Sequence, residues 1–153
     1  LSQDYTCVAL RQPGEYAIHE GRLISNRGMD IPVSEFLDHF DEEHVKHSNA
    51  LHGYQKPDRS PYLVGPIARY NLNYDQLSDL ARESAAAAGL PRIVTNPFHS
   101  IVVRSVEVLQ ACQDALAIVE SYEEPDASSV TVTPRAGVGH GCTEAPRGIC
   151  NHR

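Results

Sequence analysis

The stretch from residue 98 to residue 123 constrains the fold most, because it predicts one long helix. Pro97 stands where a helix tolerates proline, in its first turn, and Pro125 ends the pattern. Apolar side chains recur at spacings of three and four residues, which is the repeat of one helix face: Ile101, Val108, Leu109, Cys112, Ala115, Leu116, Val119 and Tyr122. Such a face needs a partner to cover it, so we expect this helix to build the core.

The segments on either side of this helix predict short strands. Residues 5–10 and 15–26 carry strand-forming side chains, and turns at 12–14 and 20–21 divide them into an antiparallel three-stranded unit. Residues 130–133 and 149–152 predict two further strands near the end of the chain. Strands followed by helices and then by strands are typical of the α+β class, which is the fold class that we expect.

Two shorter helices and one irregular stretch are predicted between these parts. Ser34 is placed to cap a helix that runs to about Glu43, and Asp75 is placed to cap a helix over residues 76–88. Residues 44–73 predict a long loop because prolines and glycines interrupt them: Gly53, Pro57, Pro61, Gly65 and Pro66. A loop of this length inside a domain is often functional.

The length of 153 residues fits a single domain, residues 1–153, and the net charge of −7 argues against binding to nucleic acid. No apolar run is long enough to span a membrane, and the start shows no secretory signal. Four cysteines are too few for a secreted disulfide framework, so we predict a cytoplasmic location. The chain stops at Arg153 in a strand that has just begun, and we therefore expect an internal fragment of a longer protein.

The last eighteen residues hold an unusual mixture of glycines with chemically active side chains. Glycines in such number let another group approach the backbone closely, and the side chains among them suggest that this group is polar or metallic. The composition alone also fits a surface loop. The side chains concerned are His140, Cys142, Glu144, Arg147, Cys150 and His152.

Three stretches of the chain resemble the large (alpha) subunit of nickel–iron hydrogenases. Thr143-Glu-Ala-Pro-Arg-Gly148, preceded by Gly137-x-Gly-x-Gly141, is similar to the Glu-Ala-Pro-Arg-Gly segment of that family. Residues 42–52 (Glu-Glu-His-Val-Lys-His-Ser-Asn-Ala-Leu-His) and 61–73 (Pro-Tyr-Leu-Val-Gly-Pro-Ile-Ala-Arg-Tyr-Asn-Leu-Asn) agree as well, and all three occur in the expected order. The pattern is most similar to the soluble enzymes that couple hydrogen to a nicotinamide or deazaflavin cofactor.

The resemblance implies a site built around Arg147. In the family the Pro-Arg pair overhangs the nickel–iron centre, and the arginine contacts a diatomic ligand of iron. Carried over, Arg147 is the cofactor-binding residue, Pro146 fixes the backbone beside it, and Glu144, with His140, supports the site. Glu144 could relay protons or serve as an ion-pair partner, and a surface salt bridge between Glu144 and Arg147 is the simpler alternative.

The resemblance also implies what this chain lacks. The family binds nickel and iron through two Cys-x-x-Cys motifs, and no such pair occurs here, so no metal ligand is assigned to this chain. The parent enzyme would split H₂ into a hydride and a proton. Its electrons would pass through a small iron–sulfur subunit to a nicotinamide or deazaflavin module, and this fragment, which supplies only residues around the metal centre, would be inactive alone.

Other interpretations stay open at this point. The quinone-reducing relative in respiratory complex I shares the Glu-Ala-Pro-Arg-Gly segment without the metal, and a stand-alone metal- or partner-binding module is a third possibility. His44, His47 and His52 could hold zinc, although no cysteine lies near them. Cys142 and Cys150 could form a thiolate–imidazole site or could be buried as small apolar residues. Arg69 could be a structural anchor or could line a subunit interface.

Overall fold

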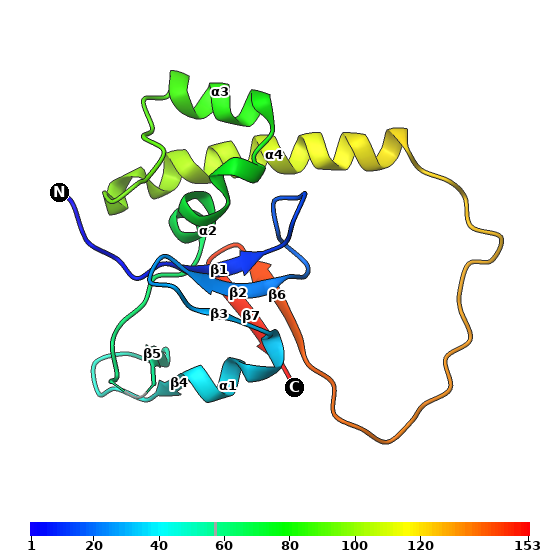
Figure 1. Cartoon of the computed structure of the whole chain (residues 1–153), viewed down its shortest axis with the longest axis horizontal. Helices are drawn as coiled ribbons and strands as arrows, with labels where there is room; N and C mark the ends of the chain where they lie inside the picture. Colours follow the sequence, from blue (N-terminus) through cyan, green and yellow to red (C-terminus); the bar gives the residue numbers. More distant parts are fainter. Residues whose placement is uncertain (57) are drawn as a thin grey trace.

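The computed structural model, which describes residues 1–56 and 58–153, confirms the predicted α+β class (Figure 1). Pro57, which contributed to the predicted loop, lies outside the described residues. Three small antiparallel sheets and a group of helices make up the fold. Its apolar core consists of two clusters, one among the helices and one between the first sheet and the last hairpin.

The first sheet is antiparallel and has the order β1-β2-β3, with β1 (Val8–Arg11) at one edge, then β2 (Arg22–Ser25) and β3 (Asp30–Ile31). The predicted three-stranded unit is therefore present, but its third strand is β3 and not the stretch after residue 15. Tyr16 and Ala17 are buried and pack into the core, which holds that stretch as a loop. Leu10 pairs with Leu23, and both side chains are fully buried.

The long helix is confirmed as α4 (Ser100–Glu120), and a 3₁₀ turn (Pro97–His99) precedes it. Asn96 caps this turn, since its side chain accepts a hydrogen bond from the Phe98 N–H at 3.1 Å. The expectation that the whole helix builds the core is wrong. Its buried residues, Val103, Val106 and Gln110, all lie in the first half.

The second half of α4 extends away from the body of the molecule (Figure 1). Its apolar side chains follow the predicted repeat but are exposed, because no other element of the described residues lies along them. These exposed residues include Cys112, Leu116 and Val119, and Tyr122, just beyond the end of α4, is exposed as well.

Residues 44–73 are more regular than predicted, because α2 (Pro66–Asn73) and β5 (His52–Gln55) lie within them. Pro66 occupies the first turn of α2, where its missing N–H costs nothing, so this proline starts a helix and does not break one. Six of the eight residues of α2 are buried, and α2 packs against β1 and α4.

The predicted helix from Ser34 to Glu43 is mostly wrong. A 3₁₀ turn (Val33–Glu35) and the short α1 (Phe36–His39) occupy its first part, and Ser34 does not cap either of them. The chain then becomes β4 (Phe40–Glu43), which pairs antiparallel with β5. Phe40 is buried against Phe36 and Tyr62, and this contact decides in favour of the strand.

The predicted helix over residues 76–88 is confirmed as α3 (Asp79–Ala87), but its cap is Ser78 and not Asp75. The Ser78 hydroxyl accepts a hydrogen bond from the Ala81 N–H at 3.1 Å. Asp75 instead forms an ion pair with Arg11 at 2.6 Å, and this pair ties the end of β1 to the turn before α3.

The chain ends in a hairpin of β6 (Gly141–Ala145) and β7 (Gly148–His152), joined by Pro146 and Arg147. The predicted strand at residues 149–152 is thus part of β7, whereas residues 130–133 form no strand. None of the helices formed by residues 1–56 and 58–153 has the length and apolar character needed to cross a membrane.

Candidate functional site

The three motif stretches meet around one cavity of about 590 Å³. Residues of the β4–β5 hairpin, of the segment before α2 and of the last hairpin all line its wall. The lining includes Glu42, Gly53, Tyr62, Val64, Arg147 and Cys150. Segments that lie far apart in the sequence, from Glu42 to Cys150, therefore form one concave surface.

Close contacts between glycines and neighbouring chain segments allow this assembly. A Cβ on Gly53 would lie 2.7 Å from the Tyr62 hydroxyl, and a Cβ on Gly148 would collide with a methyl group of Val64. Gly65 has a φ of +87°, and a Cβ there would lie 2.7 Å from the Arg147 carbonyl oxygen. Glycine at position 65 thus brings the start of α2 against the Pro146–Arg147 turn.

Arg147 lies exposed at this turn and lines the cavity. Its guanidinium forms no ion pair within the described part of the chain, so the alternative of a surface salt bridge to Glu144 is wrong. The arginine is free to donate hydrogen bonds to an anionic or polar group in the cavity.

Glu144 lies on β6 and is buried, with its side chain 0% exposed. One carboxylate oxygen accepts a hydrogen bond from the Leu10 N–H at 2.8 Å, and the other accepts one from Arg69 at 3.1 Å. The Asn73 side chain donates to the Leu10 carbonyl oxygen at 2.9 Å. Glu144 and Asn73 therefore satisfy the backbone of β1, the edge strand of the first sheet.

Arg69 is the centre of this buried network, and only 4% of its side chain is exposed. It forms a two-point ion pair with Glu107 of α4, with distances of 2.7 and 2.9 Å, and it also contacts Glu144. It donates further hydrogen bonds to the carbonyl oxygens of Ala145 at 2.8 Å and Pro146 at 3.4 Å. Arg69 thus clamps the backbone of the turn that presents Arg147.

The anchor role considered for Arg69 fits this geometry. Sequence reasoning missed its partners, because Glu107 and Glu144 lie 38 and 75 residues away. The available signal was Arg69 itself, which follows Gly65 and Pro66 in a mostly apolar stretch. An arginine on a helix that is packed on all sides needs carboxylate partners.

A second cavity of about 360 Å³ lies beside this network, between α4 and the loop after β1. Tyr16 lines it and donates a hydrogen bond from its hydroxyl to Glu107 at 2.8 Å. Burial, with the charge of Glu107, raises the pKa of Tyr16 well above its usual range, so Tyr16 stays protonated as a donor.

Burial raises the pKa of Glu144, although the Leu10 N–H and the Arg69 charge act in the opposite direction. For Arg69, burial alone would lower the pKa, but the ion pairs with Glu107 and Glu144 outweigh burial and raise it. Arg69 is therefore a permanent positive charge, and the charge of Glu144 depends on it.

The cysteines of the last hairpin do not converge on a common point. Cys142 is buried in the core, and burial raises its pKa to about 12, so it remains a neutral thiol. The Cys150 sulfur lies 3.1 Å from Nε2 of His152 on the same strand. His140 is exposed beside another cavity. The alternative of a small buried residue fits Cys142, and the thiolate–imidazole metal site does not form among the described residues.

The histidines of the second motif form no metal site in the part of the chain that the structure describes. His47 and His52 pack edge to face with ring centroids 5.3 Å apart, and His44 is exposed. The zinc interpretation is therefore not supported at these positions.

Comparison with known proteins shows that the chain is similar to part of a hydrogenase large subunit. The relatives belong to the F420-non-reducing hydrogenase vhu of two organisms. The protein from Methanococcus voltae is 32% identical over 142 residues, and that from Methanocaldococcus jannaschii is 29% identical over 132 residues. These matches cover 86% and 81% of this chain. The resemblance to a hydrogenase large subunit is therefore confirmed.

The chain spans about a third of the length of these relatives, 33% and 31% respectively. No protein-family profile matches it. Both relatives are named as hydrogenases, which are oxidoreductases.

Proposed function

We propose that this chain is part of the large subunit of a nickel-dependent hydrogenase and supplies residues that surround its metal centre. The observation that carries the proposal is the match to a hydrogenase large subunit over most of the chain. The convergence of the three motif stretches on one cavity supports it, since Arg147 lies there on a turn that buried charges hold.

Arg147 is the proposed cofactor-contacting residue. Its guanidinium remains charged and offers several rigid donors, which suits a small anionic or polar ligand. Pro146 restricts the backbone on one side of Arg147, and Gly65 packs against its carbonyl oxygen. Glu144 acts here through Arg69, as a buried counter-charge that fixes the turn, and not as the ion-pair partner of Arg147.

The described residues do not supply ligands for a nickel–iron centre. Such a centre requires several thiolates, whereas Cys142 is a buried neutral thiol and Cys150 contacts a histidine on its own strand. The proposed contribution of this chain is therefore to bind and orient groups around the centre, and no reaction step is derived from it.

We propose that the whole protein splits H₂ into a hydride and a proton. It would act together with a small iron–sulfur subunit and would be located in the cytoplasm. Both relatives are named as not reducing F420, a deazaflavin, and this disfavours a deazaflavin module as the electron acceptor. The nicotinamide module remains the proposed acceptor. Residues 1–153, proposed to be one domain of the large subunit, would be inactive alone.

The test is the nickel and iron content of the protein isolated from its natural source, together with its mass. We expect a chain much heavier than 16.8 kDa that carries both metals. A native chain that contains no nickel would contradict the proposal, and a heavier metal-free chain would favour the quinone-reducing homologue.

A further inference from the structure

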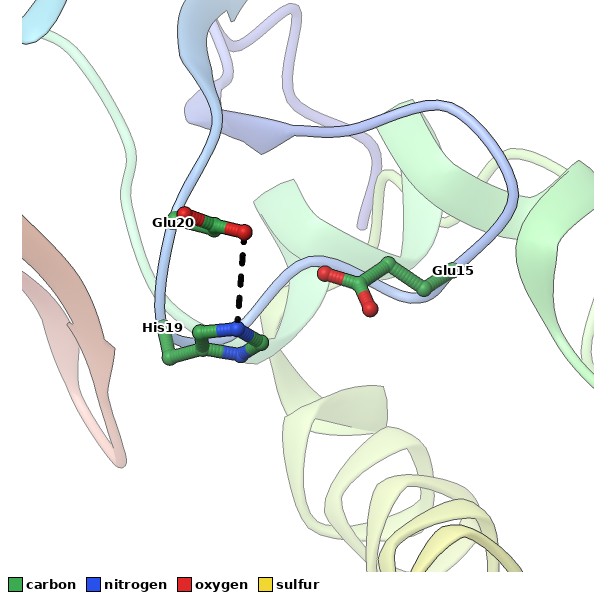
Figure 2. Close-up of side chains that lie close together, drawn as sticks. All are labelled: Glu15, His19 and Glu20. Atoms are coloured by element: carbon green, nitrogen blue, oxygen red, sulfur yellow. Dashed lines mark ion pairs between the residues drawn. The ribbon is translucent and has the colours of Figure 1, made fainter.

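Three metal-binding side chains converge in the loop between β1 and β2, outside the motif stretches. One possible ligand atom from each of Glu15, His19 and Glu20 lies within 4.8 Å of the other two. Figure 2 shows the Glu15 carboxylate directed toward the pair formed by His19 and Glu20. Within residues 1–56 and 58–153 this is the single group of three such side chains that are so close together.

The loop that carries these residues is held in place at several points. Gly21, at its end, has a φ of +142°, and a Cβ there would lie 2.6 Å from the Arg11 carbonyl oxygen, so the neck of the loop is tightly closed. Gln12 forms a backbone bridge with Glu15 and donates a side-chain hydrogen bond to Glu20 at 2.9 Å.

The middle of the loop is fixed to the core. Tyr16 is buried next to Glu15, and its hydroxyl donates to Glu107. The Ile18 carbonyl oxygen, next to His19, accepts a hydrogen bond from the Glu144 N–H at 2.6 Å. The backbone that carries the three side chains is therefore fixed before any ligand arrives, and this lowers the entropic cost of binding.

The charges in the loop are not balanced by cations. Glu15 forms no ion pair among the described residues, and its Oε1 is buried without a hydrogen-bond partner in that part of the chain. Within residues 1–56 and 58–153, the one ionic partner of Glu20 is His19, at 3.7 Å. The neighbouring Arg11 and Arg22 are paired with Asp75 and Asp30, each at 2.6 Å. A buried carboxylate oxygen without a donor is costly, and a bound cation would remove that cost.

We propose that Glu15, His19 and Glu20 bind one divalent transition-metal ion, with Zn²⁺ as the representative ion. An imidazole with two carboxylates suits zinc and similar ions, whereas Mg²⁺ and Ca²⁺ prefer sites made of oxygen atoms alone. Three protein ligands leave a coordination position for water, and the adjoining cavity, which His19 and Glu20 line, gives access to it. This site does not depend on the hydrogenase proposal.

The test is a titration of the full-length protein, freed of loosely bound metal, with ZnCl₂ and in parallel with MgCl₂. We expect Glu15→Gln and His19→Gln each to remove one equivalent of bound Zn²⁺, or to weaken its binding at least about tenfold. The exposed positions His44 and Glu124 provide matched controls, and His44→Gln and Glu124→Gln should bind zinc as the wild type does.

A second measurement uses Co²⁺, because a bound cobalt ion reports its ligands through its visible absorption. The band of the wild-type protein should change in His19→Gln while the far-ultraviolet circular dichroism stays the same. Unchanged zinc stoichiometry and affinity in both loop variants would overturn the proposal. Equal displacement of Zn²⁺ by Mg²⁺ would overturn the assignment to a transition metal.

Discussion

The two hairpins that carry motif residues, β4–β5 and β6–β7, have similar size but opposite surroundings. In β4–β5 the charged side chains face solvent. Glu43 forms an ion pair with Arg59, which follows the hairpin, and both side chains of this pair are exposed to solvent. In β6–β7 the Glu144 side chain is 0% exposed, and its partner Arg69 is 4% exposed.

This difference separates charges that fix the fold from charges that do not. Arg69 holds α4, β6 and the Pro146–Arg147 turn through bonds to four groups, so the turn can present Arg147 in a defined place. The β4–β5 hairpin is held mainly by Phe40 and by the contact of Gly53 with Tyr62. Its charged residues contribute little to stability and are available to solvent or to a partner.

The largest effect is expected when Arg69 is replaced by alanine. The change leaves the buried Glu144 and the half-buried Glu107 without their counter-charge, and removal of one partner from such a network costs about 3–5 kcal/mol. Urea denaturation of the full-length protein measures this loss. Arg59→Ala, which removes the exposed ion-pair partner of Glu43 on β4, is the matched control and should leave the unfolding midpoint unchanged.

Arg69→Lys sharpens this test if the alanine variant does not fold. Lysine keeps the charge but not the planar fork that bonds to several acceptors, so its stability should lie between that of the wild type and that of the alanine variant. Equal stability of the Arg69→Ala and Arg59→Ala proteins would contradict the contrast between the hairpins.

A smaller effect is expected from Gly65→Ala. Gly65 and Gly14 have almost the same φ, +87° and +85°, but a Cβ at Gly65 would meet the Arg147 carbonyl while a Cβ at Gly14 would meet nothing within 4 Å. Gly65→Ala and the control variant Gly14→Ala each introduce backbone strain of about 1–2 kcal/mol. The loss in the free energy of unfolding should be greater for Gly65→Ala, because this variant also displaces the turn, and equal losses would show that the turn is not held there.

The smallest effect concerns the titration of one carboxylate in each hairpin. The Glu42 N–H donates a hydrogen bond to the Asp41 carboxylate at 2.9 Å, and this bond lowers the pKa of Asp41. Burial, in contrast, raises the pKa of Glu144. The contribution of Asp41 to stability is present above pH 3.8 and is lost as the pH falls through its lowered pKa. The contribution of Glu144 to stability is largest below pH 4.5 and declines as the pH rises through its raised pKa.

Carbon NMR of the two carboxyl groups across this pH range measures both pKa values. The variants Asp41→Asn and Glu144→Gln assign the signals. A pKa of Glu144 below that of Asp41 would contradict the difference in burial between the two hairpins.

Local sequence signals predicted the elements that local interactions determine. The repeat of three and four residues and Pro97 located α4 correctly, and the turn residues located β1 and β2, although β3 was not predicted. α2 was missed because Pro66 was interpreted as a breaker, although proline is favoured in a first helical turn. β4 was missed because Phe36, Leu37 and Phe40 also fit a helical face. Its pairing with β5 and the contact of Phe40 with Tyr62 decide its structure, and neither can be recognised from the residues of β4 alone.

Long-range contacts explain why the candidate site was predicted only in part. The resemblance identified Glu144, Pro146 and Arg147, but neither composition nor spacing could show that Glu144 pairs with Arg69 across 75 residues. The metal-ligand group at Glu15, His19 and Glu20 escaped notice because its irregular spacing matches no common motif. The apolar face of α4 was recognised, but the described residues do not cover its second half.

The role of Arg147 is tested most directly by hydrogen–deuterium exchange between the gas and water, catalysed by the full-length protein with Arg147→Lys. We expect the variant to keep its nickel and iron but to lose exchange activity at least about 100-fold, because lysine cannot reproduce the donor geometry of arginine at the held turn. Wild-type exchange rates in Arg147→Lys, or a wild-type protein without nickel, would contradict this role.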